Sequence, residues 1–206
     1  WADLIDEQDK VRLLIDPTST YGRAAAAAMG RAMDDEIIAA ALGTAKTGKD
    51  GGTDTALPAG QKIAHGSAGL TIAKLLSAKE VLDANSVDPS ITRHIVVSPK
   101  QISDLLNNTT VTSSDFNTVK ALAQGELSSF VGFNFIVSNR LTTDSNSDRQ
   151  VIAFASDGIK VGMGKEPMAK IDERSDKSYA TQVYYCQTLG ATRMEEAKVV
   201  EIACNE

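Results

Sequence analysis

One long helix near the start of the chain constrains the fold more than any other feature. It is expected to run from Pro17 to Leu42, because proline is favoured in the first helical turn, and Gly43 is expected to end it. Apolar side chains recur every four residues along it, at Met29, Met33 and Ile37. The helix is therefore predicted to be amphipathic.

Five consecutive alanines, Ala24 to Ala28, lie in the first half of this helix. Alanine has high helix propensity, and its small side chain also lets another backbone approach closely. Two interpretations stay open: the run packs closely against a sheet or a neighbouring subunit, or it fills an exposed helix. Under the first, a bulky residue at Ala26 is expected to disrupt assembly, whereas Lys74, expected on the outward face of a later helix, is expected to be neutral.

The segment Gly43 to Gly69 is rich in Gly, Thr, Asp and Lys and has no sustained periodicity. It is predicted to be a long surface loop or a hairpin arm, with too few apolar residues to pack on its own domain. A second amphipathic helix is expected from Thr71 to about Asn85. Next comes a strand, His94 to Val97, that leads into a helix through the chain's strongest local signal, a capping box with the residues Ser98, Pro99 and Gln101.

A third helix is expected around Asp115 to Gln124. Beyond it, alternating apolar residues predict strands, separated by turns at "TTDSNSD" and "ERSDKS". The alternating sets are Phe133, Phe135 and Val137; Ile159, Val161 and Met163; and Val200, Ile202 and Cys204. Because helices come mostly first and strands mostly last, the pattern favours an α+β fold.

Composition excludes some functions. The net charge of -6 and pI near 5.0 provide no basic field for tight binding to phosphate backbones. No apolar run is long enough to cross a bilayer, so no membrane partner is expected. The chain opens on Trp1 instead of methionine, and we expect the native start to be missing. The two cysteines, Cys186 and Cys204, are expected to be free, unreactive thiols.

The sharpest enzyme candidate is the segment Gly43 to Lys49, which reads Gly-x-x-x-x-Gly-Lys. A phosphate-binding loop needs a hydroxyl after its lysine to hold magnesium, but Asp50 stands there. Such a loop also follows a strand and opens a helix, whereas this segment follows a helix. A nucleotide-binding enzyme built on Gly43 to Lys49 is therefore an unlikely alternative.

Other chemistry has weaker support. His65 and His94 have no second ligand at metal spacing. The acidic residues Asp34, Asp35 and Glu36 point in different directions on a helix. Cys186 has no adjacent base in sequence. The sequence predicts no catalytic, cofactor-binding or metal-binding residues and no cofactor.

The order of segments resembles that of tailed-bacteriophage major capsid proteins over essentially the whole chain. The resemblance is carried by "DDEIIAAALGTAKTG", "RHIVVSPKQISDLL" and "LSSFVGFNFIVSNRL", followed by "QVIAFASDGIKVGM" and "YATQVYYCQTLGATRMEEAKVVEI". The most telling pieces are Phe130 to Phe133, similar to that family's turn into a strand, and Tyr184 to Arg193. This family has the Hong Kong 97 (HK97-like) shell fold, which encapsulin nanocompartments share.

The resemblance implies an α+β subunit with a long spine helix, a peripheral domain and an axial domain. Residues 1–70 would be the first part of the peripheral domain, 71–155 the axial domain, and 156–206 return strands that are mainly peripheral. The family's extended hairpin arm precedes its spine helix, and most of that region is absent here. No lysine and asparagine pair matches the family's cross-link.

The implied function is structural. The subunit would self-assemble, as pentamers and hexamers, into the icosahedral shell of a virion, with assembly in the host cytoplasm. Scaffolding, portal and decoration proteins are possible partners, and packaged DNA would be held only by weak, non-specific contact. An encapsulin-type nanocompartment shell is the nearest alternative.

Overall fold

The computed structural model describes residues 2–6, 18–107 and 129–206. By its contacts the chain divides into two compact units: unit 1 comprises residues 1–36 and 161–190, and unit 2 comprises 37–160 and 191–206. The helix expected around Asp115 to Gln124 lies outside the described residues.

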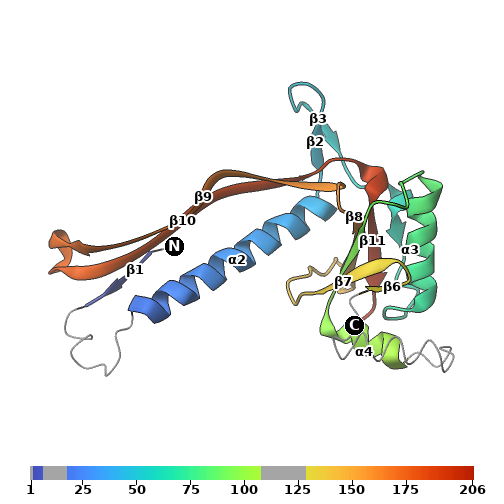
Figure 1. Cartoon of the computed structure of the whole chain (residues 1–206). Coiled ribbons are helices and arrows are strands. Elements are labelled where there is room, and N and C mark those ends of the chain that lie inside the picture. The colour runs from blue at the N-terminus through green and yellow to red at the C-terminus, as the bar shows by residue number, and fades with distance from the viewer. Residues whose placement is uncertain (1, 7–17, 108–128) are drawn as a thin grey trace. The chain divides into compact units, whose positions relative to one another are not determined.

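Unit 1 combines most of a long helix with a three-stranded sheet (Figure 1). The helix α2 spans Thr18–Leu42, so its predicted end is confirmed, while Pro17 lies outside the described residues. In the sheet, β10 (Ala180–Arg193) lies between β1 (Ala2–Ile5) and β9 (Ile159–Arg174). The last six residues of α2 belong to unit 2.

Within unit 1, one face of α2 packs on β10. The Gln187 side chain donates a hydrogen bond to the Met29 carbonyl at 3.2 Å. A Cβ atom at Gly22 would lie 3.7 Å from the Tyr185 hydroxyl. Ala25 is three residues after Gly22 and four before Met29, so it shares their face of the helix, and it is fully buried.

The close-packing interpretation of the alanine run therefore holds at Ala25. Ala26 is exposed in the subunit, so a bulky residue there would not push α2 away from β10, and its effect on assembly stays a prediction. Consecutive helical residues point about 100° apart, so a run of alanines offers only some of its members to the neighbouring strand. Composition alone could not tell which ones.

Unit 2 is built on a six-stranded mixed sheet (Figure 1). Its strands, in spatial order, are β4 (Lys62–Ile63), β11 (Val199–Cys204), β8 (Arg149–Ala155), β5 (Arg93–Val97), β7 (Phe133–Val137) and β6 (Ser129–Phe130). The pairs β5·β7 and β11·β4 are parallel, and the other pairs are antiparallel. The strands predicted from alternating residues at 133–137 and 200–204 are confirmed in this sheet as β7 and β11, and the third, at 159–163, is confirmed in β9 of the three-stranded sheet.

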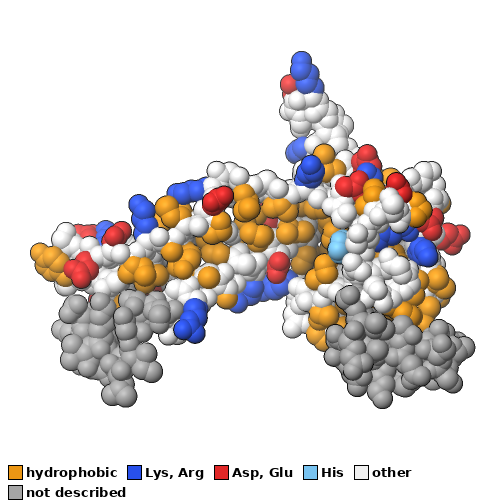
Figure 2. Space-filling model, in the orientation of Figure 1, with side chains coloured by type: hydrophobic (Ala, Val, Ile, Leu, Met, Phe, Trp, Pro, Cys, Tyr) orange, Lys and Arg blue, Asp and Glu red, His pale blue; other side chains and the backbone are white. Residues whose placement is uncertain are grey.

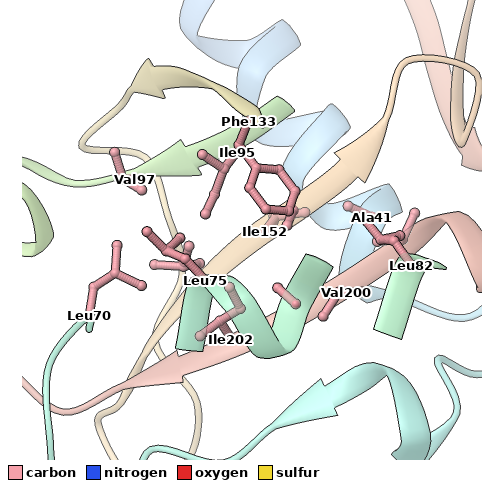
Figure 3. Packing of buried hydrophobic residues seen from close by; sticks show 14 of the residues in the cluster. Ala41, Leu70, Leu75, Leu82, Ile95, Val97, Phe133, Ile152, Val200 and Ile202 are labelled. Carbon is pink, nitrogen blue, oxygen red and sulfur yellow. The ribbon is translucent and has the colours of Figure 1, made fainter. Parts of the chain in front are cut away.

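Helix α3 (Ile72–Ala84) covers this sheet and forms the main core with it (Figure 3). Its buried apolar residues recur at helical spacing, at Leu75, Ala78 and Leu82. The sheet contributes fully or almost fully buried side chains from four strands, namely Ile95, Val97, Phe133, Ile152, Val200 and Ile202. The last turn of α2 adds Ile38 and Ala41.

Helix α4 (Pro99–Asn107) begins at the predicted capping box. The Gln101 side chain accepts a hydrogen bond from the Ser98 backbone N–H at 2.7 Å, which confirms one half of the box. The Ser98 hydroxyl instead bonds to the carboxylate of Glu206 at 3.2 Å, and Gln101 donates to the same oxygen at 2.5 Å. A carboxylate that lies just after β11 thus bonds both side chains of the capping pair.

The segment after α2 was predicted to be either a surface loop or a hairpin arm, and it contains a hairpin. Strands β2 (Ala45–Thr47) and β3 (Thr53–Thr55) pair in antiparallel register, and a 3-10 turn, η1 (Ala59–Gln61), leads into β4. The expectation that this segment cannot pack on its own domain is wrong, because Leu57 and Gln61 are buried and β4 joins the main sheet.

We predict that Ala25→Leu destabilises the subunit by about 1–3 kcal/mol, because a larger side chain must push α2 away from β10. Ala26→Leu is the matched control and should change the free energy of unfolding by less than about 0.5 kcal/mol. Chemical denaturation of the soluble subunits, with hydrogen exchange of the α2 amides, measures both. Equal effects at the two positions would contradict this packing.

Candidate functional site

The most highly organised polar site in unit 2 surrounds Arg193, at the end of β10. Its side chain is fully buried. One terminal nitrogen, Nη1, donates to the carbonyls of Ala41 at 2.9 Å and Gly43 at 2.8 Å, and Nη2 donates to the carbonyl of Thr55 at 2.9 Å. A single guanidinium therefore joins the end of α2, the base of the β2–β3 hairpin and the end of β10.

This arrangement gives a donor to the Ala41 carbonyl, which lies in the last turn of α2, where carbonyls have no partner within the helix. It also places a cation at the negative end of the helix dipole. Burial lowers the Arg193 pKa, and Glu196, whose carboxylate lies 3.9 Å from Nε, opposes that effect. Gly43 is needed here, since a Cβ atom would lie 2.7 Å from the Ala39 carbonyl oxygen.

The near-motif Gly43 to Lys49 does not form a phosphate-binding loop. Its residues run from the end of α2 through the first strand of the hairpin into the hairpin turn, and no helix follows. Lys49 and Asp50 are exposed in that turn, beside Gly48 with φ of 87°. The strand, loop and helix that cradle a phosphate are therefore missing from this segment.

The two histidines lie apart and serve local structure. His65 is partly exposed, and its Nδ1 accepts a hydrogen bond from the Ser67 backbone N–H at 3.2 Å. His94 packs its ring on Phe154, with ring centroids 5.6 Å apart. Among the described residues, no group of His, Cys, Asp or Glu side chains could hold a metal ion.

The three acidic residues Asp34, Asp35 and Glu36 follow one another on α2. Asp34 and Glu36 are exposed, and Asp35 is half-buried. No helix in the described part of the chain is long and apolar enough to cross a membrane.

Cys186 is a free thiol, as expected, and its reactivity stays a prediction. It lies half-buried on β10, and a hydrogen bond from Lys165, together with one involving Tyr184, lowers its pKa. The sequence could not show this, because Lys165 is on β9 and reaches Cys186 only through strand pairing. Cys204 fits the expectation: it is buried, and burial raises its pKa to about 11.

Lys74 also corrects an expectation. Its side chain is buried, and Nζ donates to the carbonyls of Ala68 at 2.7 Å, Gly69 at 2.8 Å and Ala203 at 3.0 Å. Burial lowers its pKa. The ammonium group thus fixes the loop before α3 to the end of β11, and Lys74 does not lie on an outward face.

The comparison with known families is decisive. The family model described as phage capsid protein matches residues 1–206, the entire chain. The chain belongs to this family. No curated protein matches it in sequence.

Solved structures agree at the level of the fold. The chain is similar to one from Mycobacterium phage Che8 (20% identity, TM-score 0.69), covering 98% of this chain and 68% of that one. It is similar to the capsid of the Cyanophage P-SCSP1u (20% identity, TM-score 0.75, 100% and 71% covered). The capsid of Ralstonia phage GP4 gives 12% identity and a TM-score of 0.75, with 99% and 72% covered.

The protein therefore has the HK97-like shell fold and is a structural protein, a major capsid subunit of a bacteriophage. Copies of it assemble into a multi-subunit icosahedral shell, and it is a component of the virion. The resemblance seen in the sequence is confirmed.

We predict that Lys74→Ala destabilises the subunit by at least about 2 kcal/mol, because three carbonyl groups lose a charged donor. Lys79→Ala, on the exposed side of the same helix, should leave the free energy of unfolding within about 0.5 kcal/mol of the parent. Urea titration of the soluble subunits compares them. A Lys74→Ala subunit as stable as Lys79→Ala would show that the three hydrogen bonds contribute nothing.

We predict that a thiol-alkylating reagent labels Cys186 first and leaves Cys204 largely unmodified in the native protein, because only the first is accessible and carries a lowered pKa. Lys165→Ala should move the pH midpoint of labelling upward, since the hydrogen bond that favours the thiolate is lost. Mass spectrometry after labelling over a pH series measures this. An unchanged midpoint would contradict the pairing of Lys165 with Cys186.

Proposed function

We propose that this subunit forms pentamers and hexamers that close into the icosahedral shell around phage DNA. The observation that carries the proposal is the family match over the whole chain, joined to a fold with a long helix on a long-stranded sheet. Closed symmetry multiplies modest contacts between subunits into a stable container.

The surface of unit 1 supports this role. Its sheet has a 16-residue edge strand, β9, whose alternate residues Val161, Met163 and Ile171 are exposed and apolar. On the face shown in Figure 2, hydrophobic side chains gather over α2, β9 and β10. Long apolar edge strands are aggregation sites unless something covers them, and neighbouring subunits would do so in a shell.

The interior of unit 1 points the same way. Among its described residues, the buried hydrophobic side chains are few, namely Ile5, Ala25, Ala180 and Val183. Unit 2 contains the whole main core. A unit with so little internal burial gains much of its stability from contacts with other chains.

We also propose that unit 1 corresponds to the peripheral domain and unit 2 to the axial domain. Most of α2 and most of the long strands lie in unit 1, and residues 71–155 lie in unit 2. Residues 37–70 and 191–206, which the sequence interpretation assigned mainly to the peripheral domain, pack in unit 2. Strand β11, for example, lies between β8 and β4.

Assembly would take place in the host cytoplasm, with scaffolding, portal and decoration proteins as further partners. Packaged DNA would meet the shell only through weak, non-specific contact, since the chain carries a net charge of -6. An encapsulin of Synechococcus elongatus is also similar in fold, with 9% identity and a TM-score of 0.60. A shell around a protein cargo is therefore the second candidate function.

We predict that the protein forms closed shells of uniform diameter in the electron microscope. In particles purified from infected cells, nuclease-protected DNA should accompany the shells, because the shell encloses the genome. A protein cargo without DNA would support the encapsulin alternative. Only soluble monomers, with nucleotide hydrolysis that depends on Lys49, would contradict the proposal.

A further inference from the structure

An open pocket of about 690 Å³ lies in unit 2, away from the Arg193 junction. Lys79 and Asp83 line it from α3, and Arg93 lines it from the first position of β5. Gly132 and Asn134 line it from the β6–β7 turn and from β7. Helix, loop and sheet therefore build this pocket together, within one compact unit.

Arg93 is an unusual residue in this pocket because it is buried, with an exposed fraction of 6%, and only partly hydrogen-bonded. Its Nη2 donates to the Asp83 carboxylate at 2.6 Å and to the Val87 carbonyl at 3.2 Å. Its Nε is buried and has no hydrogen-bond partner among the described residues. A guanidinium has five N–H donors, so the one on Nε remains for another acceptor.

The electrostatic balance of the pocket favours an anion. Lys79 and Arg93 bring two positive charges and Asp83 brings one negative charge, so the charged lining is net positive. The Lys79 ammonium lies close to the turn, with Nζ 3.9 Å from where a Cβ atom of Gly132 would stand. Lys79 forms no ion pair with any residue that the structure describes. Since the chain as a whole carries a charge of -6, this positive pocket opposes the overall charge.

We propose that this pocket binds a carboxylate side chain of a neighbouring copy of the chain in the assembled shell. The carboxylate would accept a hydrogen bond from Arg93 and pair with Lys79, and charge-assisted hydrogen bonds of this kind are stronger than neutral ones. Each copy of this chain has 27 acidic residues and 21 basic ones, so a neighbouring copy presents many carboxylates. Their negative charge is complementary to the positive lining of the pocket.

The pairing would also compensate the burial of Arg93. A buried guanidinium with unused donors costs free energy, because those donors have left water without gaining an acceptor. A neighbour's carboxylate supplies the acceptor only on assembly. Arg93 thus stores a cost in the isolated subunit that contact between subunits removes.

Lys79→Glu tests the proposal without touching the buried arginine. Lys79 is exposed, so the subunit should fold with an unchanged thermal midpoint, while the reversed charge repels the incoming carboxylate. We expect the protein concentration required for shell formation to rise about tenfold, which corresponds to a loss of about 1.4 kcal/mol per subunit contact. The effect should shrink at high salt. Lys160→Glu, at another exposed lysine of the same unit outside the pocket, should assemble like the parent.

The density at the pocket in a cryo-electron microscopy map of the parent shell decides the occupant. The proposal predicts an acidic side chain of the adjacent subunit within about 3 Å of Arg93 or Lys79. A pocket that faces solvent, an inorganic phosphate ion or packaged nucleic acid would overturn it, as would normal assembly of Lys79→Glu. This proposal rests on the proposed function, because it requires that shells form. A parent chain that forms no shells would contradict the proposed function. Shells in which no neighbouring side chain occupies this pocket would contradict only the proposed carboxylate site.

Discussion

The buried guanidinium of Arg193 is the interaction on which the junction of this subunit depends. It donates to the carbonyls of Ala41 and Gly43 at the end of α2 and to that of Thr55 at the base of the hairpin. The end of α2 and the hairpin that follows it meet the end of β10, which is distant in sequence, at one planar group, and the rigid geometry of that group fixes the direction of each. A lysine, as a point charge on a flexible chain, could not hold three carbonyls in the same arrangement.

The Arg193 junction lies in unit 2, at the ends of α2 and β10. Both of these elements also run through unit 1. The hairpin beside it has two short strands that pair only with each other among the described residues. A two-stranded hairpin is marginally stable alone, so its attachment through the Thr55 carbonyl determines whether it keeps one direction. Shell subunits need such fixed directions because a closed shell repeats each contact in every copy.

Local signals in the sequence predicted local structure well. The sequence could not predict the contacts between distant segments. The capping pair Ser98 and Gln101 and the end of α2 follow from residues three or four apart, and both are confirmed. Lys74 looked like an ordinary surface lysine, since its acceptor at Ala203 lies 129 residues away. The function followed from segment order across the whole chain, because no single motif carries it.

The unfolding and hydrogen exchange of Arg193→Lys test this account most directly. The substitution keeps the charge and removes the fork, so at least one of the three carbonyls loses its donor. We expect the free energy of unfolding to fall by at least about 2 kcal/mol and the amides of β2 and β3 to exchange faster than those of the main sheet. If Arg193→Lys leaves both the stability and the protection of the hairpin unchanged, the junction does not depend on the guanidinium, and the account is wrong.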